Sequence, residues 1–349
     1  MTALFTLSFP PESPLETVPL VQLAEHLGYS GVWIPDSQLL WREPFTSLAY
    51  YVSKTNRIGL GFAVTNIVTR HVSVLASAAA TLNEMSGGRV VLGIGSGATG
   101  VGVAGLRRAT LAQLEKSVTI VRQLLSGESV PTGSQTLSSD KGHEYLPEDE
   151  MRLHWKPGTP PPPIFLSAHG PRALRLAGKI ADGVVYSLGA LPEMVRFANE
   201  RISEGVNERG KDNPSKVQRW SRVALAIGEK EDKKAILNEV RPYVATVETN
   251  LAFLGSAVDI PSSLRDEALQ TLKKYDISEH VQTNAEHARL ISDNAVEQLA
   301  IVGTPPECVE RIAELQKSGA ANFNFVIFTA KDKKRLMERF ASEVMPHVR

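Results

Sequence analysis

Eight short apolar runs alternate with longer amphipathic segments along this chain, and this alternation limits its possible folds more than any other feature. Each run has the length and apolar character of a strand that is buried on both faces. Strands that alternate with helices pair in parallel, so we expect an α/β protein, either a doubly wound sheet or a barrel. A count of eight favours a single (β/α)8 TIM barrel over residues 1–349. The runs occupy residues 3–9, 31–36, 57–64, 89–95, 163–168, 181–188, 219–228 and 322–328.

The segments between these runs carry helix signals. Residues 71–88 repeat apolar side chains at helical spacing and end at two glycines. The spacing of Ser13 and Glu16 around Pro14 predicts a capping box for a helix over 13–28, and a Thr-x-x-Glu box predicts another over 304–320. Further helices are predicted over 43–55, 106–128, 171–180, 191–210 and 333–348.

Two segments depart from the alternation. Residues 127–160 are polar and end in a run of prolines, so we predict a hairpin within 142–155 followed by a stiff extended lead-in. Residues 230–300 have helical patterning and no strand pattern. Because that stretch is too long for one crossover, we interpret it as a helical insertion after the seventh strand.

The composition argues against several classes of protein. The 38 Lys and Arg residues balance 38 Asp and Glu residues, so no bulk charge indicates nucleic acid or a membrane surface as partner. Cys308 is the only cysteine, and the histidines lack metal-ligand spacing, so we expect no disulfide within the chain and no metal. No apolar stretch reaches the ~18 residues of a membrane span. The first residues lack the pattern of a signal peptide, so we expect a cytoplasmic protein.

Glycines follow the fourth run in a pattern that needs interpretation. Gly95, Gly97 and Gly100 spell G-x-G-x-x-G, and Glu115 lies downstream. A dinucleotide fingerprint follows the first strand of its fold and ends its next strand with the acid. Here Glu115 lies in a helical pattern, which argues against that interpretation. The glycines either let the chain turn or let its backbone approach a cofactor.

Loops of unusual composition also follow other strands, at residues 35–43, 63–71 and 167–171. In a barrel the carboxyl ends of all strands lie on one face, where active sites are built. Four such loops on one face favour the interpretation that the glycines line a cofactor site.

Four segments resemble the luciferase-like monooxygenase superfamily, and within it the deazaflavin (F420) dependent branch that includes methylene-tetrahydromethanopterin reductases. They are "GVWIPDSQLLWREP" (31–44), "FAVTNIVTRHVSVLASAAATLNEMSGGRVVLGIGSG" (62–97), "PIFLSAHGPRALRLAGKIADGVV" (163–185) and "VGTPPECVERIAELQKSGA" (302–320). The resemblance implies a (β/α)8 barrel that binds F420 or FMN at its C-terminal mouth and forms a homodimer or higher oligomer.

The resemblance also implies positions for the cofactor. A non-proline cis peptide at Ala63–Val64 would lie behind the flavin ring, with Thr65 and Asn66 at its pyrimidine side. Pro171 would open the helix after the phosphate loop. The ring or ribityl chain would lie near Gly97, Ala98 and Thr99, and the phosphate would bind backbone N–H groups of Ser167, Ala168, His169 and Gly170.

The predicted catalytic residues are Asp36, Ser37 and Gln38. Some F420 enzymes have Asp-His after strand two, but this chain has Ser37 after the aspartate, which argues against sugar-phosphate dehydrogenase chemistry. Asp36 either acts as an acid or base with a raised pKa or bonds loop amides. Trp41 either walls the site or anchors a helix.

Three other side chains near the expected mouth have structural alternatives. Arg107 and Arg108 would begin the helix over 106–128, where they either hold the phosphate or acidic tail of F420 or form a solvated face. His71 precedes a helix, so capping or packing is favoured over contact with the cofactor.

These observations lead to one preferred function and two alternatives. The preferred function is an F420-dependent oxidoreductase that transfers a hydride between the deazaflavin C5 and a small organic substrate. The first alternative is an FMN-dependent monooxygenase that uses reduced FMN and dioxygen. The second is a non-catalytic flavin-binding protein.

Overall fold

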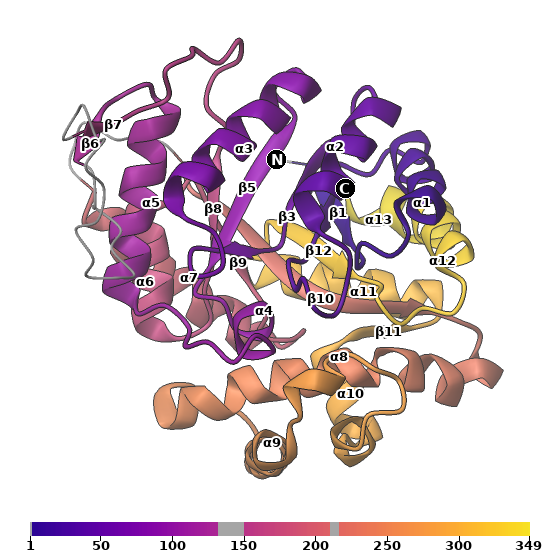
Figure 1. Ribbon diagram of the computed structural model, residues 1–349. Helices are drawn as coiled ribbons and strands as arrows, with labels where there is room; N and C mark the ends of the chain where they lie inside the picture. The colour runs from indigo at the N-terminus through magenta and orange to yellow at the C-terminus, as the bar shows by residue number, and fades with distance from the viewer. Residues whose placement is uncertain (1, 132–149, 210–215) are drawn as a thin grey trace.

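Eight parallel strands close into a barrel (Figure 1). The computed structural model describes residues 2–131, 150–209 and 216–349. Strand β1 pairs with both β2 and β12, and the pairing of β9 with β10 closes the ring. The barrel strands are β1 (Phe5–Ser8), β2 (Gly31–Ile34), β3 (Gly59–Phe62), β5 (Val90–Gly95), β8 (Ile164–Ser167), β9 (Gly183–Tyr186), β10 (Gln218–Ile227) and β12 (Asn322–Val326).

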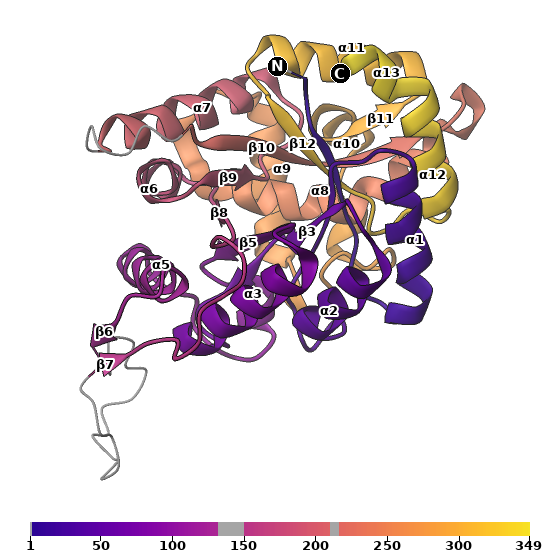
Figure 2. The same ribbon diagram turned by 90° about the horizontal axis from the view of Figure 1, so that it is seen from above.

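Helices surround the barrel strands (Figure 2). Their apolar faces cover the strands, which are buried along almost all of their length because each faces both the barrel interior and the helices. The surrounding helices are α1 (Pro14–His26), α2 (Pro44–Lys54), α3 (Val72–Ser86), α5 (Leu111–Leu125), α6 (Pro171–Ile180), α7 (Pro192–Asn207), α11 (Pro305–Lys317), α12 (Lys333–Arg339) and α13 (Met345–Val348).

The predicted α/β class, the barrel and all eight predicted strands are confirmed. The sequence patterns did not indicate three short strands and one short helix. These are β4 (Thr65–Asn66), β6 (Val130–Pro131), β11 (Ile301–Gly303) and α4 (Thr99–Gly102). A further short strand, β7 (Glu150–Met151), lies within the predicted hairpin. Strands β6 and β7 pair antiparallel, while most of the predicted hairpin lies outside the described residues.

Two predictions about helix starts are wrong. Ser13 precedes α1 but makes no side-chain capping bond, so the predicted capping box is absent and Pro14 alone marks the start. The helix predicted over 106–128 begins at Leu111, because Thr110 and Gln113 form a capping box there. Arg107 and Arg108 therefore lie in the loop before α5. The box of Thr304 and its partner at the start of α11 is confirmed.

The helical insertion after the seventh barrel strand is confirmed. It contains α8 (Lys233–Leu254), α9 (Ser262–Lys274) and α10 (Asp293–Leu299), joined by short 3-10 turns. These helices lie across one end of the barrel, at the bottom of Figure 1. No helix in the described part of the chain is long and apolar enough to cross a membrane.

Candidate active site

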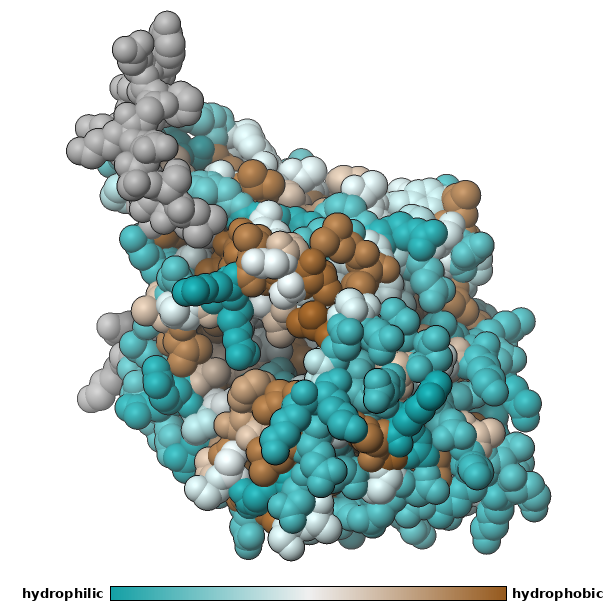
Figure 3. Space-filling view, turned by 60° about the horizontal axis from the view of Figure 1, so that its bottom comes forward, coloured by the Kyte–Doolittle hydropathy of each residue, from teal (hydrophilic) through white to brown (hydrophobic). Residues whose placement is uncertain are grey.

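A cavity of about 340 Å³ lies at the carboxyl ends of the barrel strands. Figure 3 shows apolar residues gathered around a hollow on this face of the molecule. The loops after β2, β3, β5 and β8 all contribute to its wall, as the sequence predicts. The predicted site residues that line it are Asp36, Ser37, Ala63, Val64, Thr65, Asn66, Gly97, Ala98, Thr99, Ser167, Ala168, His169 and Gly170.

Two predicted site residues do not line this cavity. The side-chain amide of Gln38 donates to the Gly100 carbonyl at 3.3 Å, which ties the loop after β2 to the one after β5. Pro171 is the first residue of α6, as predicted, and does not line the cavity.

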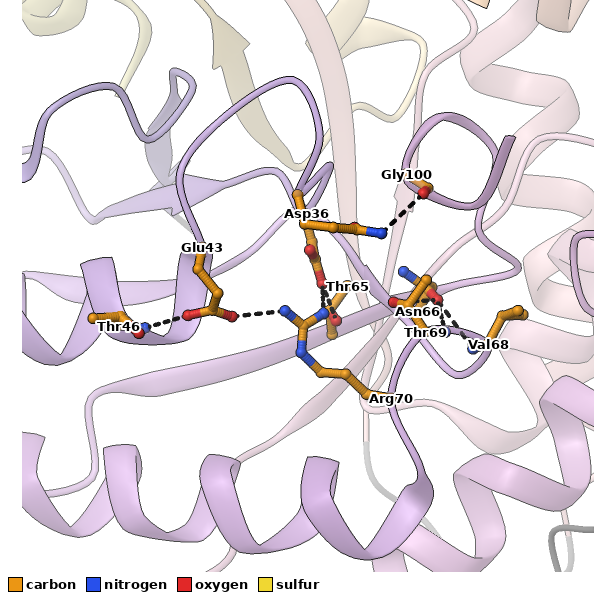
Figure 4. Close-up of polar contacts among 10 residues, drawn as sticks. Asp36, Glu43, Thr46, Thr65, Asn66, Val68, Thr69, Arg70 and Gly100 are labelled. Carbon is orange, nitrogen blue, oxygen red and sulfur yellow. Dashed lines mark hydrogen bonds and ion pairs between the residues drawn. The ribbon is translucent and has the colours of Figure 1, made fainter. Parts of the chain in front are cut away.

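Asp36 is held in a chain of polar contacts (Figure 4). Its Oδ2 accepts a 2.7 Å hydrogen bond from the Thr65 hydroxyl and an ion-paired bond from Arg70. Arg70 also donates to Glu43 at 2.6 Å, so it lies between the two carboxylates. The Asp36 side chain is fully buried and that of Glu43 is 43% exposed. The sequence did not indicate Arg70 as the partner of Asp36.

The surroundings of Asp36 change its protonation. Burial is the largest influence and raises its pKa, outweighing the lowering by the Arg70 charge and the Thr65 hydrogen bond. Its second oxygen, Oδ1, is buried and accepts no hydrogen bond from the described residues. A buried carboxyl oxygen that has no hydrogen-bond partner and lies beside a cavity is available to bind a ligand in that cavity.

The peptide bond between Ala63 and Val64 is cis, as the resemblance implies. Arg222 on β10 donates to the Ala63 carbonyl from inside the barrel and to the Ser8 hydroxyl at 3.2 Å. Its Nε donates to the Tyr243 hydroxyl at 3.1 Å. Arg222 therefore links the cavity floor to β1 and to the insertion helix α8.

Backbone without side chains forms two other parts of the wall. Gly97 has φ +83°, and a Cβ there would lie 2.3 Å from a methyl group of Val101. A Cβ on Gly100 would lie 2.5 Å from the Asp36 carbonyl oxygen. Gly100 therefore lets the loop after β5 pack closely against the loop after β2, and Gly97 lets that loop fold back against its own Val101.

The other end of the cavity is the start of α6. Gly170 is the N-cap residue of this ten-residue helix, and a Cβ there would meet no atom within 4 Å. The first-turn N–H groups of a helix have no partner within it, so this end can accept a phosphate. Nδ1 of His169 accepts from Ser187 N–H at 3.2 Å. Burial, aided by the Arg222 charge, lowers the pKa of His169 to about 4 and keeps it neutral.

Comparison with known families identifies this arrangement. The family model described as luciferase-like monooxygenase matches residues 3–322, most of the chain. The chain belongs to the luciferase-like monooxygenase family. It is therefore a luciferase-like enzyme.

Relatives of this luciferase-like enzyme match it nearly end to end. It is 29% identical over 337 residues to the 5,10-methylenetetrahydromethanopterin reductase of Archaeoglobus fulgidus, covering 94% of each chain. It is 25% identical to the F420-dependent glucose-6-phosphate dehydrogenase of Nakamurella multipartita, covering 96% of this chain and 93% of that one. The structure of the F420-dependent tetrahydromethanopterin reductase from Methanopyrus kandleri matches at 24% identity, with a TM-score of 0.72 and full coverage of both chains.

The helical insertion of this luciferase-like enzyme forms much of the remaining wall, which the sequence did not predict. Its contributions are Tyr243, Thr246, Asn250, Phe253, Leu254 and His280. Trp41 also lines the cavity and packs edge-on against Phe328, with ring centroids 5.6 Å apart. The position of the insertion in the chain could have predicted this contribution, because a segment that follows a barrel strand must begin at the mouth of the barrel.

The remaining sequence candidates have structural contacts in this luciferase-like enzyme. His71 is the N-cap residue of α3, and its Nδ1 accepts from the Ser73 N–H, which confirms capping. Glu115 lies in α5 and pairs with Lys179 at 3.0 Å, away from the cavity, which agrees with the argument against a dinucleotide fingerprint. Arg108 lines the mouth, with its guanidinium 5.4 Å from the Phe253 ring centroid.

Proposed function

We propose that this luciferase-like enzyme is an F420-dependent oxidoreductase that transfers a hydride to or from a small organic substrate. The observation that carries the proposal is the convergence of a helix N-terminus and a buried carboxyl group with an unpartnered oxygen on one cavity. Full-length similarity to a methylenetetrahydromethanopterin reductase and to an F420-dependent dehydrogenase supports F420 as the cofactor. Bound F420 supplies or accepts the hydride at its C5 carbon.

The residues present fit such a cofactor. The open space beside Gly170 and the first turn of α6 accommodate the phosphate. Ala63 and Val64, which follow β3, would lie behind the ring, and Thr65 and Asn66, which form β4, would meet it from the cavity wall. The Oδ1 of Asn66 already accepts from the Val68 and Thr69 N–H groups, so its amide nitrogen is the group left for the cofactor.

Asp36 is the residue best placed to move a proton. Its carboxyl group lines the cavity, and Oδ1 has no hydrogen-bond partner among the described residues. Because its pKa is raised, Asp36 gains or loses its proton closer to neutral pH than an ordinary aspartate does. Arg70 and Thr65 hold the other oxygen, which fixes the direction of the carboxyl group. A substrate between this group and the aromatic wall of Trp41 and Phe328 would give a proton to Asp36 or take one from it.

Cofactor titration tests the proposal directly. The purified protein is titrated with F420 and separately with FMN, and bound cofactor is followed by fluorescence. Reduced F420 is then mixed anaerobically with aldehydes, ketones, imines and activated alkenes, and its oxidation is followed by visible absorption. We expect tighter binding of F420 than of FMN and oxidation that needs no dioxygen. Oxygen consumption with reduced FMN, and none with reduced F420, would overturn the proposal.

Asp36→Asn tests the proton role separately. We expect F420 affinity to be unchanged and turnover to fall about 100-fold or more, the usual contribution of a general acid or base. The control is Glu43→Gln, which alters the other carboxylate partner of Arg70 outside the cavity. Unchanged turnover in Asp36→Asn would exclude the proton role and favour a protein that only binds flavin.

A further inference from the structure

Arg222 is a buried cation in the cavity wall, and its contacts with the residues that the structure describes are all with uncharged groups. Its residue is 9% exposed and lines the cavity. Its three guanidinium nitrogens donate to the Ala63 carbonyl, the Ser8 hydroxyl and the Tyr243 hydroxyl. Hydrogen bonds to neutral acceptors fix the guanidinium in place but leave its charge unbalanced.

No carboxylate balances this charge in the part of the chain that the structure describes, where no Asp or Glu oxygen lies within 4.0 Å of the Arg222 nitrogens. The Phe328 ring lies 5.7 Å from the guanidinium. The histidines that feel the charge are neutral: after burial, Arg222 is the next cause that lowers the pKa of His169 to about 4 and that of His280 to about 3. Asp36, the one buried carboxylate among the described residues of the wall, is already paired with Arg70.

Burying a cation without a countercharge costs free energy, so a bound ligand that supplies negative charge beside it would be stabilised. The cation at the mouth, Arg108, is exposed, so water screens it. Arg222 instead touches the carbonyl of the cis peptide on the cavity floor. An anion bound at that floor would interact with the Arg222 charge through protein of low dielectric constant and not through water.

We propose that Arg222 is the countercharge for a bound cofactor ring in its anionic form. The inference rests on the proposed function, because it assigns the floor of the cavity to the deazaflavin ring. The ring hydroxyl of F420 is a weak acid, and its conjugate base spreads the negative charge over the conjugated ring system. Ionisation releases the proton to solvent and leaves the charge on the ring, where Arg222 stabilises it.

The test is a pH titration of the visible spectrum of F420 bound to the wild-type protein, to Arg222→Met and to Arg222→Lys. The neutral and anionic rings absorb differently, so the spectrum reports ionisation without any substrate. We expect the ring to ionise at lower pH in the wild-type complex than in free F420. In Arg222→Met the acid dissociation constant of the ring should fall at least about tenfold, a shift of about one pH unit. Arg222→Lys should restore most of the difference.

Two control variants separate charge from position. Tyr243→Phe loses the hydroxyl that accepts from Arg222 but keeps the cation, so the ring should ionise close to the wild-type pH. Arg108→Met loses a screened charge of the same sign at the mouth and should change ionisation by much less than Arg222→Met.

The outcomes are distinguishable. If wild-type protein does not bind F420, the proposed function itself fails. If F420 binds but its ring ionises at or above the pH of the free cofactor, the role of Arg222 is refuted while the function stands, and this comparison needs no variant. Equal ionisation in wild type and a folded Arg222→Met would refute it as well.

Discussion

Arg70→Met should make the stability of this protein depend on pH in a defined way. The variant leaves the fully buried Asp36 without its cation while the Thr65 hydrogen bond remains. Removing one partner of a buried ion pair typically costs about 3–5 kcal/mol. Asp36 can avoid part of that cost by taking up a proton. The free energy of protonation therefore sets an upper limit on the loss of stability, and this limit changes with pH.

That limit follows from the ordinary pKa of an aspartate. Keeping a carboxyl group protonated costs about 1.4 kcal/mol for each pH unit above about 3.9, hence about 4 kcal/mol at pH 7 and about 1.5 kcal/mol at pH 5. The Asp36 pKa is already raised by burial, and losing Arg70 raises it further. The folded variant then binds more protons than its unfolded state, so its stability rises as pH falls from 7 to 5.

Urea unfolding at pH 5, 6 and 7, followed by circular dichroism, measures this dependence. We expect the loss of unfolding free energy in Arg70→Met, relative to wild type, to decrease by up to about 1.4 kcal/mol for each pH unit from pH 7 towards pH 5. The double variant Asp36→Asn/Arg70→Met should lose this extra slope. The control Glu43→Gln should show none, since hydrogen bonds from Thr46 and Arg70 outweigh burial and hold the Glu43 pKa below its usual value, outside this range. A loss in Arg70→Met that is equal at pH 5 and pH 7 would refute the reasoning.

The remaining predictions concern Gly97, Cys308 and the oligomeric state. Gly97→Ala should destabilise the protein by more than the ~1 kcal/mol expected from left-handed backbone alone, because a Cβ there meets Val101, whereas Gly87→Ala meets no atom within 4 Å and serves as the control in thermal unfolding. Gly97→Ala should also weaken F420 binding in fluorescence titrations, and unchanged binding would place the loop outside the cofactor site. Cys308 is fully buried and burial raises its pKa to about 12, so it should react with a maleimide only after unfolding; rapid labelling of the native protein would contradict this. We expect a homodimer or higher oligomer in light scattering, and a monomer at all concentrations would contradict the expectation drawn from the family resemblance.

The barrel was predictable because its strands carry a local signal. A strand buried on both faces is a short apolar run, and each of the eight runs contains one barrel strand. The loops of the site were predictable for a related reason, since chain order alone places every loop that follows a strand on one face. The cis peptide at Ala63–Val64 was predictable only from the family resemblance, because no local sequence pattern indicates it.

The residues that sequence reasoning missed depend on contacts between distant segments. Arg222 contacts the Ala63 carbonyl across 159 positions, and Arg70 pairs with Asp36 across 34. Nothing near either arginine in the sequence specifies these partners. A local pattern can also predict a contact that does not form. The spacing of Ser13 and Glu16 satisfies the pattern of a capping box, yet the Ser13 side chain makes no capping hydrogen bond. A local pattern predicts only what the surrounding structure allows.

A crystal structure of the protein with F420 bound tests the central claim most directly, because that claim is a statement about where the cofactor lies. The account predicts that the ring rests on Ala63–Val64 with Arg222 behind it, that its phosphate binds at Ser167–Gly170, and that Asp36 Oδ1 faces the open space beside the ring. A cofactor bound elsewhere, or a ring whose phosphate lies away from the start of α6, would contradict it.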